Sequence, residues 1–248
     1  MRTLKSPRDE MYLSRLILDV RQPRVRRDLS DVYRLHRTIL SAFPQAPDNV
    51  PARAHFGILY RIEPISDMPW LVRLLVQSRE QPDWSHIPDR MFGPALDERG
   101  NPALRRIDDE YARIRSDMQF LFRLLANPTR RLSNRSSERD DRLLGKRVAL
   151  LREEEQIAWL AHKGEQHGFR LLSTSVNPDV PAVQAAKQAD EHGWRKATQT
   201  QTMHLTFGAV LFTGYLKVTD ADRFRTALEH GIGSGKAFGF GLLSIAAQ

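Results

Sequence analysis

Tyr33 and His36, three residues apart, are the side chains of this sequence best suited to chemistry. Apolar residues recur around them at helical spacing, which predicts a helix over residues 30–43 with both side chains on one face. An imidazole, with an ordinary pKa of about 6.5, exchanges protons near neutral pH. Beside RNA, such a pair can move a proton while the ribose 2′-hydroxyl attacks its own phosphate, without a metal ion. The spacing alone leaves open that both residues only face solvent.

The other histidines and the absence of cysteine argue against a metal site. No HExxH motif occurs, and His162 and His167 are five residues apart, on different faces of a predicted helix. Without cysteine, the chain has no thiolate nucleophile, disulfide or cysteine-based zinc site. We therefore expect neither a metal ion nor another cofactor.

A second candidate site is the glycine-rich segment GIGSGKAFGFG at residues 231–241. A nucleotide-binding P-loop is disfavoured, because Ala237 follows Lys236 and the segment leads from a helix to a strand rather than the reverse. The backbone N–H groups of Gly231, Gly233 and Gly235, together with Lys236, could cradle an RNA phosphate. The alternative is a tight helix-to-strand turn, and the sequence leaves it open.

The charge balance favours a polyanionic partner. Lys and Arg number 38 against 30 acidic residues, for a formal net charge of +8. Arginine dominates the excess, and its planar guanidinium suits bidentate contacts to phosphate. A basic protein without such a partner remains the plainer alternative, because net charge reports only on non-specific attraction.

No segment predicts a membrane span or a leader peptide. A membrane helix needs an apolar run of about 20 residues, and the chain has none. Residues 1–10 are polar and charged, which does not fit a secretory signal. We expect a cytoplasmic location.

The elements that must position these residues form two similar series. The first is strand, helix, strand, strand, an undecided segment and a strand, and the second is strand, helix, strand, strand, helix, strand. The charges of the last segment of the first series, 107–114, also permit a helix. An arginine-rich loop is expected before the first helix, a mobile basic loop at 128–152 and an irregular region at 177–200. The predicted strands are 11–19, 56–64, 70–78, 107–114, 118–127, 169–175, 203–218 and 240–246, and the other predicted helices are 151–167 and 221–230.

Two copies of one pattern predict an α+β fold of tandem ferredoxin-like domains, each an antiparallel sheet with helices on one face. We expect an N-terminal extension at residues 1–10, a first domain at 11–114 that carries the histidine helix, and a second at 115–248 with the glycine-rich loop and an RNA-binding hairpin.

Several stretches resemble the CasE family, the CRISPR RNA-processing endoribonucleases of type I-E Cascade complexes. The resemblance runs across nearly the whole chain from residue 11. The matching stretches are MYLSRLIL at 11–18, DVYRLHRTIL at 31–40, LVQS at 75–78, PDW at 82–84, FRLLANPTRR at 122–131, EEQIAWLAHK at 154–163 and GIGSGKAFGFGLLSIA at 231–246. The last two of these stretches are the most specific in combination.

The resemblance implies two ferredoxin-like (RAMP) domains and metal-independent cleavage of precursor CRISPR RNA at the base of the repeat stem-loop. The products it implies are a 2′,3′-cyclic phosphate and a 5′-hydroxyl, with the cut RNA retained as the protein joins other Cascade subunits. The family's catalytic Tyr-x-x-His pattern falls here on Tyr33 and His36, and its phosphate-binding loop falls on Lys236. Some relatives carry a lysine about a turn after the histidine; here the place falls near Ser41, so no second catalytic cation is assigned.

Further RNA contacts are expected from basic residues. Arg27 and Arg37 flank the histidine helix and could stabilise charge on the scissile phosphate. Lys187, Arg195 and Lys196 precede the long strand and are expected on a β-hairpin that reaches the RNA stem. The rival hypothesis is a non-catalytic RNA-binding subunit of the same fold.

Overall fold

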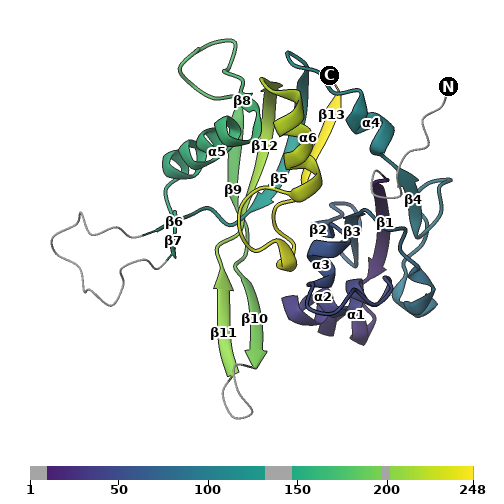
Figure 1. Ribbon diagram of the computed structural model, residues 1–248. Helices are drawn as coiled ribbons and strands as arrows, with labels where there is room; N and C mark the ends of the chain where they lie inside the picture. Colours follow the sequence, from purple (N-terminus) through teal and green to yellow (C-terminus); the bar gives the residue numbers. More distant parts are fainter. Residues whose placement is uncertain (1–9, 132–146, 197–201, 248) are drawn as a thin grey trace, which may run out of the picture.

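The computed structural model describes residues 10–131, 147–196 and 202–247, with the backbone alone at 191–196 and 202–206. Residues 1–9 of the expected extension, and residues 132–146 of the expected basic loop, lie outside this description. Figure 1 shows two sheets side by side, with a two-stranded hairpin extending below them.

The first sheet has four antiparallel strands in the order β2-β3-β1-β4. Polar Ser14 lies among the buried apolar residues of β1, where its hydroxyl accepts a hydrogen bond from Trp84 Nε1 at 3.0 Å. The elements are β1 Tyr12–Asp19, α1 Pro23–Leu29, α2 Val32–Leu40, α3 Ala52–His55, β2 Leu59–Pro64, β3 Leu71–Ser78, the 3₁₀ turns Trp84–His86 and Asp89–Met91, β4 Ala103–Arg106 and α4 Asp108–Ala112.

The second sheet has the order β13-β5-β12-β8, and β9 pairs with the other part of the same edge of β12. A separate hairpin, β10 with β11, extends from it. The elements are β5 Gln119–Ala126, β6 Thr129–Arg131, β7 Arg147–Ala149, α5 Glu153–His167, β8 Phe169–Leu171, β9 Val183–Lys187, β10 Glu191–Lys196, β11 Thr202–Phe207, β12 Val210–Val218, α6 Ala221–His230, the 3₁₀ turn η5 Lys236–Phe238 and β13 Leu243–Ala247.

Both sheets place their strands in the order fourth, first, third, second when the four strands of each are counted along the chain without β9. The second domain has helices between its first and second and between its third and fourth strands, whereas the first domain has two 3₁₀ turns between β3 and β4. This order, with all pairings antiparallel, is the ferredoxin-like arrangement. The prediction of two tandem ferredoxin-like domains is therefore confirmed.

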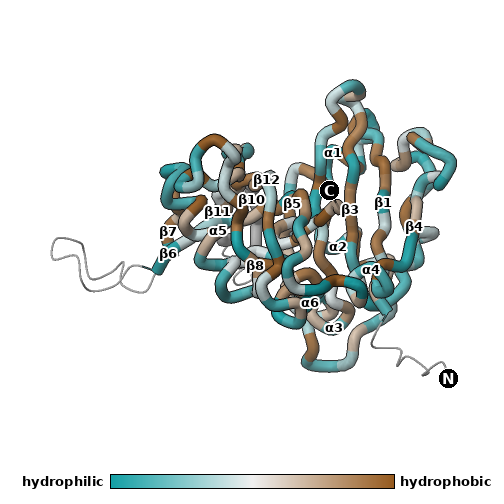
Figure 2. The backbone as a smooth tube through the Cα atoms, turned by 90° about the horizontal axis from the view of Figure 1, so that it is seen from above, coloured by the Kyte–Doolittle hydropathy of each residue, from teal (hydrophilic) through white to brown (hydrophobic). Residues whose placement is uncertain are grey.

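Each sheet has its own hydrophobic core. In the first, Leu16, Leu74 and Val76 pack against Leu35 and Ile39 of α2. The second core gathers phenylalanines of β5, β12 and α6 with Leu160 of α5. Hydrophobic colour recurs along β1, β3 and β5 in Figure 2, while hydrophilic colour dominates many connecting segments. The helices are therefore fixed to the sheets by apolar faces.

Three sequence predictions about elements are wrong. The expected arginine-rich loop contains α1, because Pro23 begins a helix whose Val25 is buried in the first core. Strand β9 lies in the region expected to be irregular, and the expected long strand 203–218 is two strands, β11 and β12, interrupted at residues 208–209. The segment 107–114, left open between a strand and a helix, contains the short helix α4, and β10 with β11 forms the hairpin expected at Arg195 and Lys196.

Candidate active site

Helix α2 presents Tyr33 and His36 beside the face that packs against the sheet. Asp31 begins the helix by accepting a hydrogen bond from the Tyr33 backbone N–H at 2.9 Å. Val32, Leu35 and Ile39 are buried, and Tyr33 and His36 are half-buried at the border of the apolar face. Their rigid position follows from this packing.

The glycine-rich loop of the second domain meets this face of α2. The Phe238 ring lies edge-on to Tyr33, with ring centroids 4.7 Å apart, and its centroid is 6.4 Å from that of His36. On its other side Phe238 contacts Phe207 at 5.0 Å, and Phe207 contacts Phe240 at 5.8 Å. Residues some 200 positions apart in the chain thus form one site.

The loop reaches this position because its glycines adopt backbone angles that other residues avoid. Gly239 and Gly241 have φ of +89° and +90°. A Cβ on Gly241 would lie 2.9 Å from the Ile232 carbonyl oxygen, so a larger residue would displace the loop. The Tyr60 hydroxyl of β2 donates to the Ala237 carbonyl at 3.0 Å, which anchors the loop to the first domain.

The surroundings of His36 favour its neutral form. Burial lowers the pKa of the imidazole below its ordinary value of 6.5, and the positive charge of Arg53 lowers it further. His36 Nδ1 is buried and has no hydrogen-bond partner in the described part of the chain. The ring therefore keeps a donor or acceptor, according to its tautomer, for a ligand.

Lys236 brings positive charge to the same place. Burial lowers its pKa, and Arg53 and Lys163 lower it further. Burial, Lys163 and Lys236 likewise lower the pKa of His167. No carboxylate within the described ranges pairs with Arg53 or Lys236, so the site is a half-buried concentration of positive charge.

Sequence reasoning did not identify Arg53, Lys163 or His167 as part of this site. Arg53 belongs to the short helix α3, and Lys163 and His167 to the C-terminal part of α5. Lys163 ends the stretch EEQIAWLAHK, but nothing in the sequence places it beside Lys236, since the proximity of these residues arises from the packing of separate elements. The sequence predicted Tyr33, His36 and Lys236 at the site, and the structure brings these three together.

The other predicted RNA-binding residues lie elsewhere. Arg27 and Arg37 line a separate groove between α1 and α2. Lys187 is exposed at the end of β9, immediately before the hairpin. Arg195 and Lys196 belong to β10, paired with Met203 and Thr202 of β11, and their side chains lie outside the described residues. Strand β10 lies next to α2, so the hairpin begins beside the candidate site (Figure 1).

Within the described ranges, no three His, Asp or Glu side chains gather as metal ligands would. Among the helices described, none has the length and apolar character required to cross a membrane.

The fold and the site together define a protein with paired ferredoxin-like domains, in which a histidine helix of the first faces a cationic glycine-rich loop of the second. The chain belongs to the CRISPR associated protein family, whose model matches residues 11–247. The resemblance stated from the motifs is thereby confirmed.

Two curated relatives and one solved structure illustrate the match. The chain is 35% identical to the CRISPR-associated endoribonuclease Cse3 of Thermus thermophilus, over 95% of this chain and all of the relative. It is 27% identical to the CRISPR system Cascade subunit CasE of Escherichia coli, over 95% of this chain and 99% of the relative. The structure of Thermus thermophilus Cse3 bound to an RNA representing a pre-cleavage complex matches with a TM-score of 0.71 and 32% identity, covering 96% of this chain and 99% of that one.

Proposed function

We propose that this protein is a metal-independent endoribonuclease that cuts precursor CRISPR RNA at the base of the repeat stem-loop. The observation that carries the proposal is the half-buried imidazole of His36, with an unpartnered Nδ1, facing a loop that brings Lys236 beside Arg53. The named activity of the Thermus relative, 35% identical over nearly the whole chain, supports it.

In the proposed reaction, His36 acts as general base. Its lowered pKa keeps the imidazole neutral at pH 7, so it can accept the proton of the ribose 2′-hydroxyl. The 2′-oxygen then attacks the adjacent phosphorus, and the bond from phosphorus to the 5′-oxygen breaks. The leaving 5′-oxygen takes a proton from water and His36 returns its proton to water, so the products carry a 2′,3′-cyclic phosphate and a 5′-hydroxyl.

Charge that develops on the phosphate oxygens in the transition state requires fixed positive groups. Lys236 and Arg53 supply them, because both are half-buried and unneutralised by carboxylates of the described chain. The backbone N–H groups of Gly233 and Gly235 offer further donors to the phosphate. That of Gly231, predicted with them, is not available, because it already donates to the Ala227 carbonyl at 2.8 Å. Tyr33, held against Phe238, orients the ribose or the phosphate.

The remaining basic residues would hold RNA away from the cut phosphate. Lys187, Arg195 and Lys196 would contact the stem from the hairpin, and Arg27 and Arg37 would contact RNA beside α2. The relative named as a Cascade subunit supports retention of the cut RNA in a complex with other Cascade proteins. We place the reaction in the cytoplasm, where the precursor transcript is made.

For the domains, we propose residues 11–114 as the first and 115–248 as the second. Tyr111 and Ile114 already pack against the second core, so the chain passes between the two units at this end of the first.

The direct test is incubation of a labelled repeat hairpin with wild-type protein, His36→Ala and His86→Ala in excess EDTA. His86 serves as the matched control because it is an exposed histidine of a 3₁₀ turn outside the site. We expect wild type and His86→Ala to cut equally, and His36→Ala to bind normally but cut about 10²–10⁴-fold more slowly.

Three other results would count against the proposal. Normal cutting by His36→Ala would refute the site. Loss of cutting with EDTA would indicate a metal mechanism. A hairpin that wild type binds and leaves intact would identify a non-catalytic RNA-binding subunit.

A further inference from the structure

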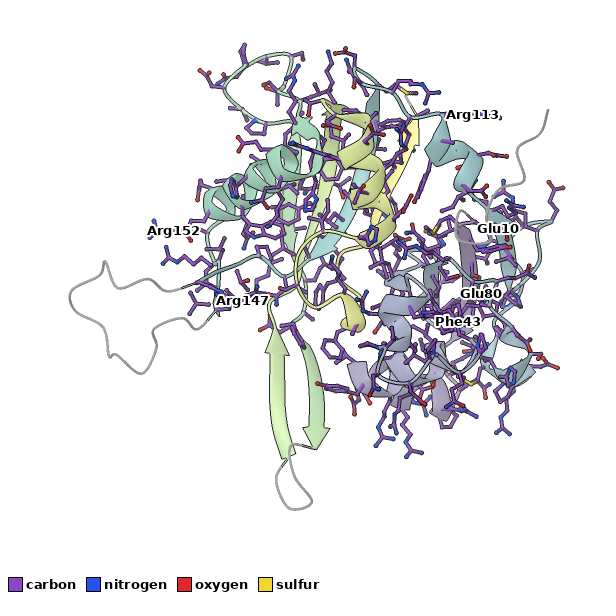
Figure 3. All side chains as sticks on the ribbon, in the orientation of Figure 1. Glu10, Phe43, Glu80, Arg113, Arg147 and Arg152 are labelled. Atoms are coloured by element: carbon purple, nitrogen blue, oxygen red, sulfur yellow. The ribbon has the colours of Figure 1, made fainter. Side chains whose placement is uncertain are left out.

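A groove of about 440 Å³ separates α1 from α2 on a face of α2 that does not carry His36. Each helix contributes two arginines spaced three residues apart, which places each pair on one side of its helix. The lining residues are Arg24, Arg27, Asp28, Arg34, Arg37, Thr38 and Ser41. Nitrogen-tipped side chains project outward from this end of the first domain in Figure 3.

The charge of this arginine groove is largely unneutralised. Its one carboxylate, Asp28, is buried and accepts a hydrogen bond from the Thr38 hydroxyl at 2.8 Å. Arg34 lies 3.5 Å from Asp31, a carboxylate outside the lining. The guanidinium groups of Arg24, Arg27 and Arg37 make no hydrogen bond or ion pair to the described residues.

Such an arrangement suits a phosphate backbone better than a protein surface. Four guanidinium groups around one space repel one another unless an anion occupies it, and guanidinium matches phosphate oxygens in bidentate geometry. The rest of the lining is polar, with the hydroxyls of Thr38 and Ser41 and no apolar side chain. The centre of a protein–protein contact is instead rich in apolar and aromatic residues.

The groove is close to the candidate active site because both lie on α2. Arg37 follows His36 directly and is turned from it by about 100° around the helix axis. A helix is about 10–12 Å across with its side chains, so an RNA strand leaving His36 would reach the groove within a few nucleotides.

We infer that the arginine groove binds the sugar–phosphate backbone of single-stranded RNA that adjoins the hairpin, a few nucleotides from the cut phosphate. The inference rests on the proposed function, since it takes the RNA at His36 as given. It adds a site for the flanking strand, with Arg24 and Arg34 acting together with Arg27 and Arg37.

The test compares three RNAs by equilibrium binding, each blocked by a 2′-deoxy nucleotide where a cut site is present. The first is the hairpin ending at the cut site, and the others carry single-stranded nucleotides on its 5′ or its 3′ side. The variant is Arg27→Gln with Arg37→Gln. Arg90→Gln with Arg170→Gln removes the same charge from exposed arginines outside the groove, neither of which forms an ion pair with the described residues.

We expect the groove variant to lose roughly tenfold in affinity for one flanked RNA and almost nothing for the bare hairpin. The slope of log affinity against log salt should fall by about 1.4 for that RNA, since each single-strand phosphate contact contributes about 0.7. The control variant should leave the difference in affinity between the flanked RNAs and the bare hairpin unchanged.

Equal losses on all three RNAs, or no loss on any, would overturn the inference. It would also fail if the groove variant bound flanked RNA normally but lost its association with other Cascade subunits, because the groove would then be a protein contact. Failure of wild type to bind even the bare hairpin would refute the proposed function itself, a result distinct from these.

Discussion

His36 combines two properties that suit a general base. Its ring is packed beside Phe238, which fixes its direction, and it lies near Arg53, whose charge opposes protonation. Burial is the larger cause of the lowered pKa, and Arg53 the smaller. A neutral imidazole that cannot rotate freely is the form required of a general base.

Removal of the Arg53 charge should therefore change both the titration and the rate. In Arg53→Gln, the pKa of His36 should rise toward 6.5, because burial remains but the nearby positive charge is gone. NMR titration of the histidines measures this shift. Since the base must be neutral, the cutting rate falls as the pH drops through this pKa, and that limb of the pH–rate profile should move to higher pH.

The maximal rate of Arg53→Gln should also fall, because one charge that stabilises the transition state is lost. Arg90→Gln, which removes an exposed arginine outside the site, should alter neither quantity. An unchanged His36 pKa in Arg53→Gln would show that the guanidinium does not act on the imidazole.

At the scale of elements, the site depends on how the glycine-rich loop lies against α2. Gly241 has a φ of +90° and donates its backbone N–H to the Leu125 carbonyl of β5 at 2.8 Å. The loop also accepts a hydrogen bond from Tyr60 and places Phe238 against Tyr33. A shift of the loop would thus move Lys236 and Phe238 together.

Gly241→Ala tests this dependence, with Gly100→Ala as its control. Both glycines have positive φ, so each alanine incurs about 1–2 kcal/mol of backbone strain. Only at Gly241 would the new Cβ meet a backbone oxygen, at 2.9 Å; at Gly100 nothing lies within 4 Å. Thermal unfolding should show a larger loss of stability for Gly241→Ala than for Gly100→Ala, and only Gly241→Ala should cut RNA more slowly. If Gly241→Ala and Gly100→Ala slowed cutting equally, the position of the loop would not control the activity.

The elements that the sequence predicted well have strong local signals. Helix α5 has acidic residues in its first turn and ends at Gly168 with φ of +75°. Helix α6 begins after Asp220, whose side chain accepts hydrogen bonds from the backbone N–H groups of Asp222 and Arg223. Helix α1 was missed because its run of arginines hides a single buried apolar residue, Val25, and no side chain caps its start. Arg53 could not be predicted, because its role depends on contacts between elements distant in sequence.

At the scale of the whole molecule, a buried ion pair links the two sheets. Arg61 of β2 lies 2.7 Å from Glu63 and donates to the Leu242 carbonyl at 2.9 Å and the Ser244 hydroxyl at 2.9 Å in the second domain. Arg73 and Arg123 lie 3.1 Å and 3.5 Å from Glu63. The relative position of the domains, and with it the distance from α2 to the loop, depends on this network.

Glu63→Gln should destabilise the fold by about 3 kcal/mol, because it leaves the buried Arg61 charge without its partner. Glu110→Gln breaks an exposed pair with Arg105 and should cost less than about 1 kcal/mol. Urea unfolding at pH 7 compares the two. Similar losses of unfolding free energy in Glu63→Gln and Glu110→Gln would mean that Glu63 contributes no more to stability than a surface charge.

The same carboxylate should make stability depend on pH. Burial opposes its ionisation, but Arg61, Arg73 and Arg123 outweigh burial and hold the pKa of Glu63 below 4.5. A lowered pKa stabilises the fold above the unfolded-state pKa, and this contribution is lost as the pH falls through the folded-state value. Unfolding free energies measured from pH 6 to pH 3 should fall less steeply for Glu63→Gln than for wild type. Equal slopes would contradict this assignment.

The most direct measurement of the proposed reaction uses a repeat hairpin with a single 2′-deoxy nucleotide at the cut site. If the ribose hydroxyl is the nucleophile and His36 removes its proton, wild-type protein should bind this RNA as tightly as the unmodified hairpin and leave it whole. Cutting of the deoxy hairpin at the normal position and rate would contradict the account.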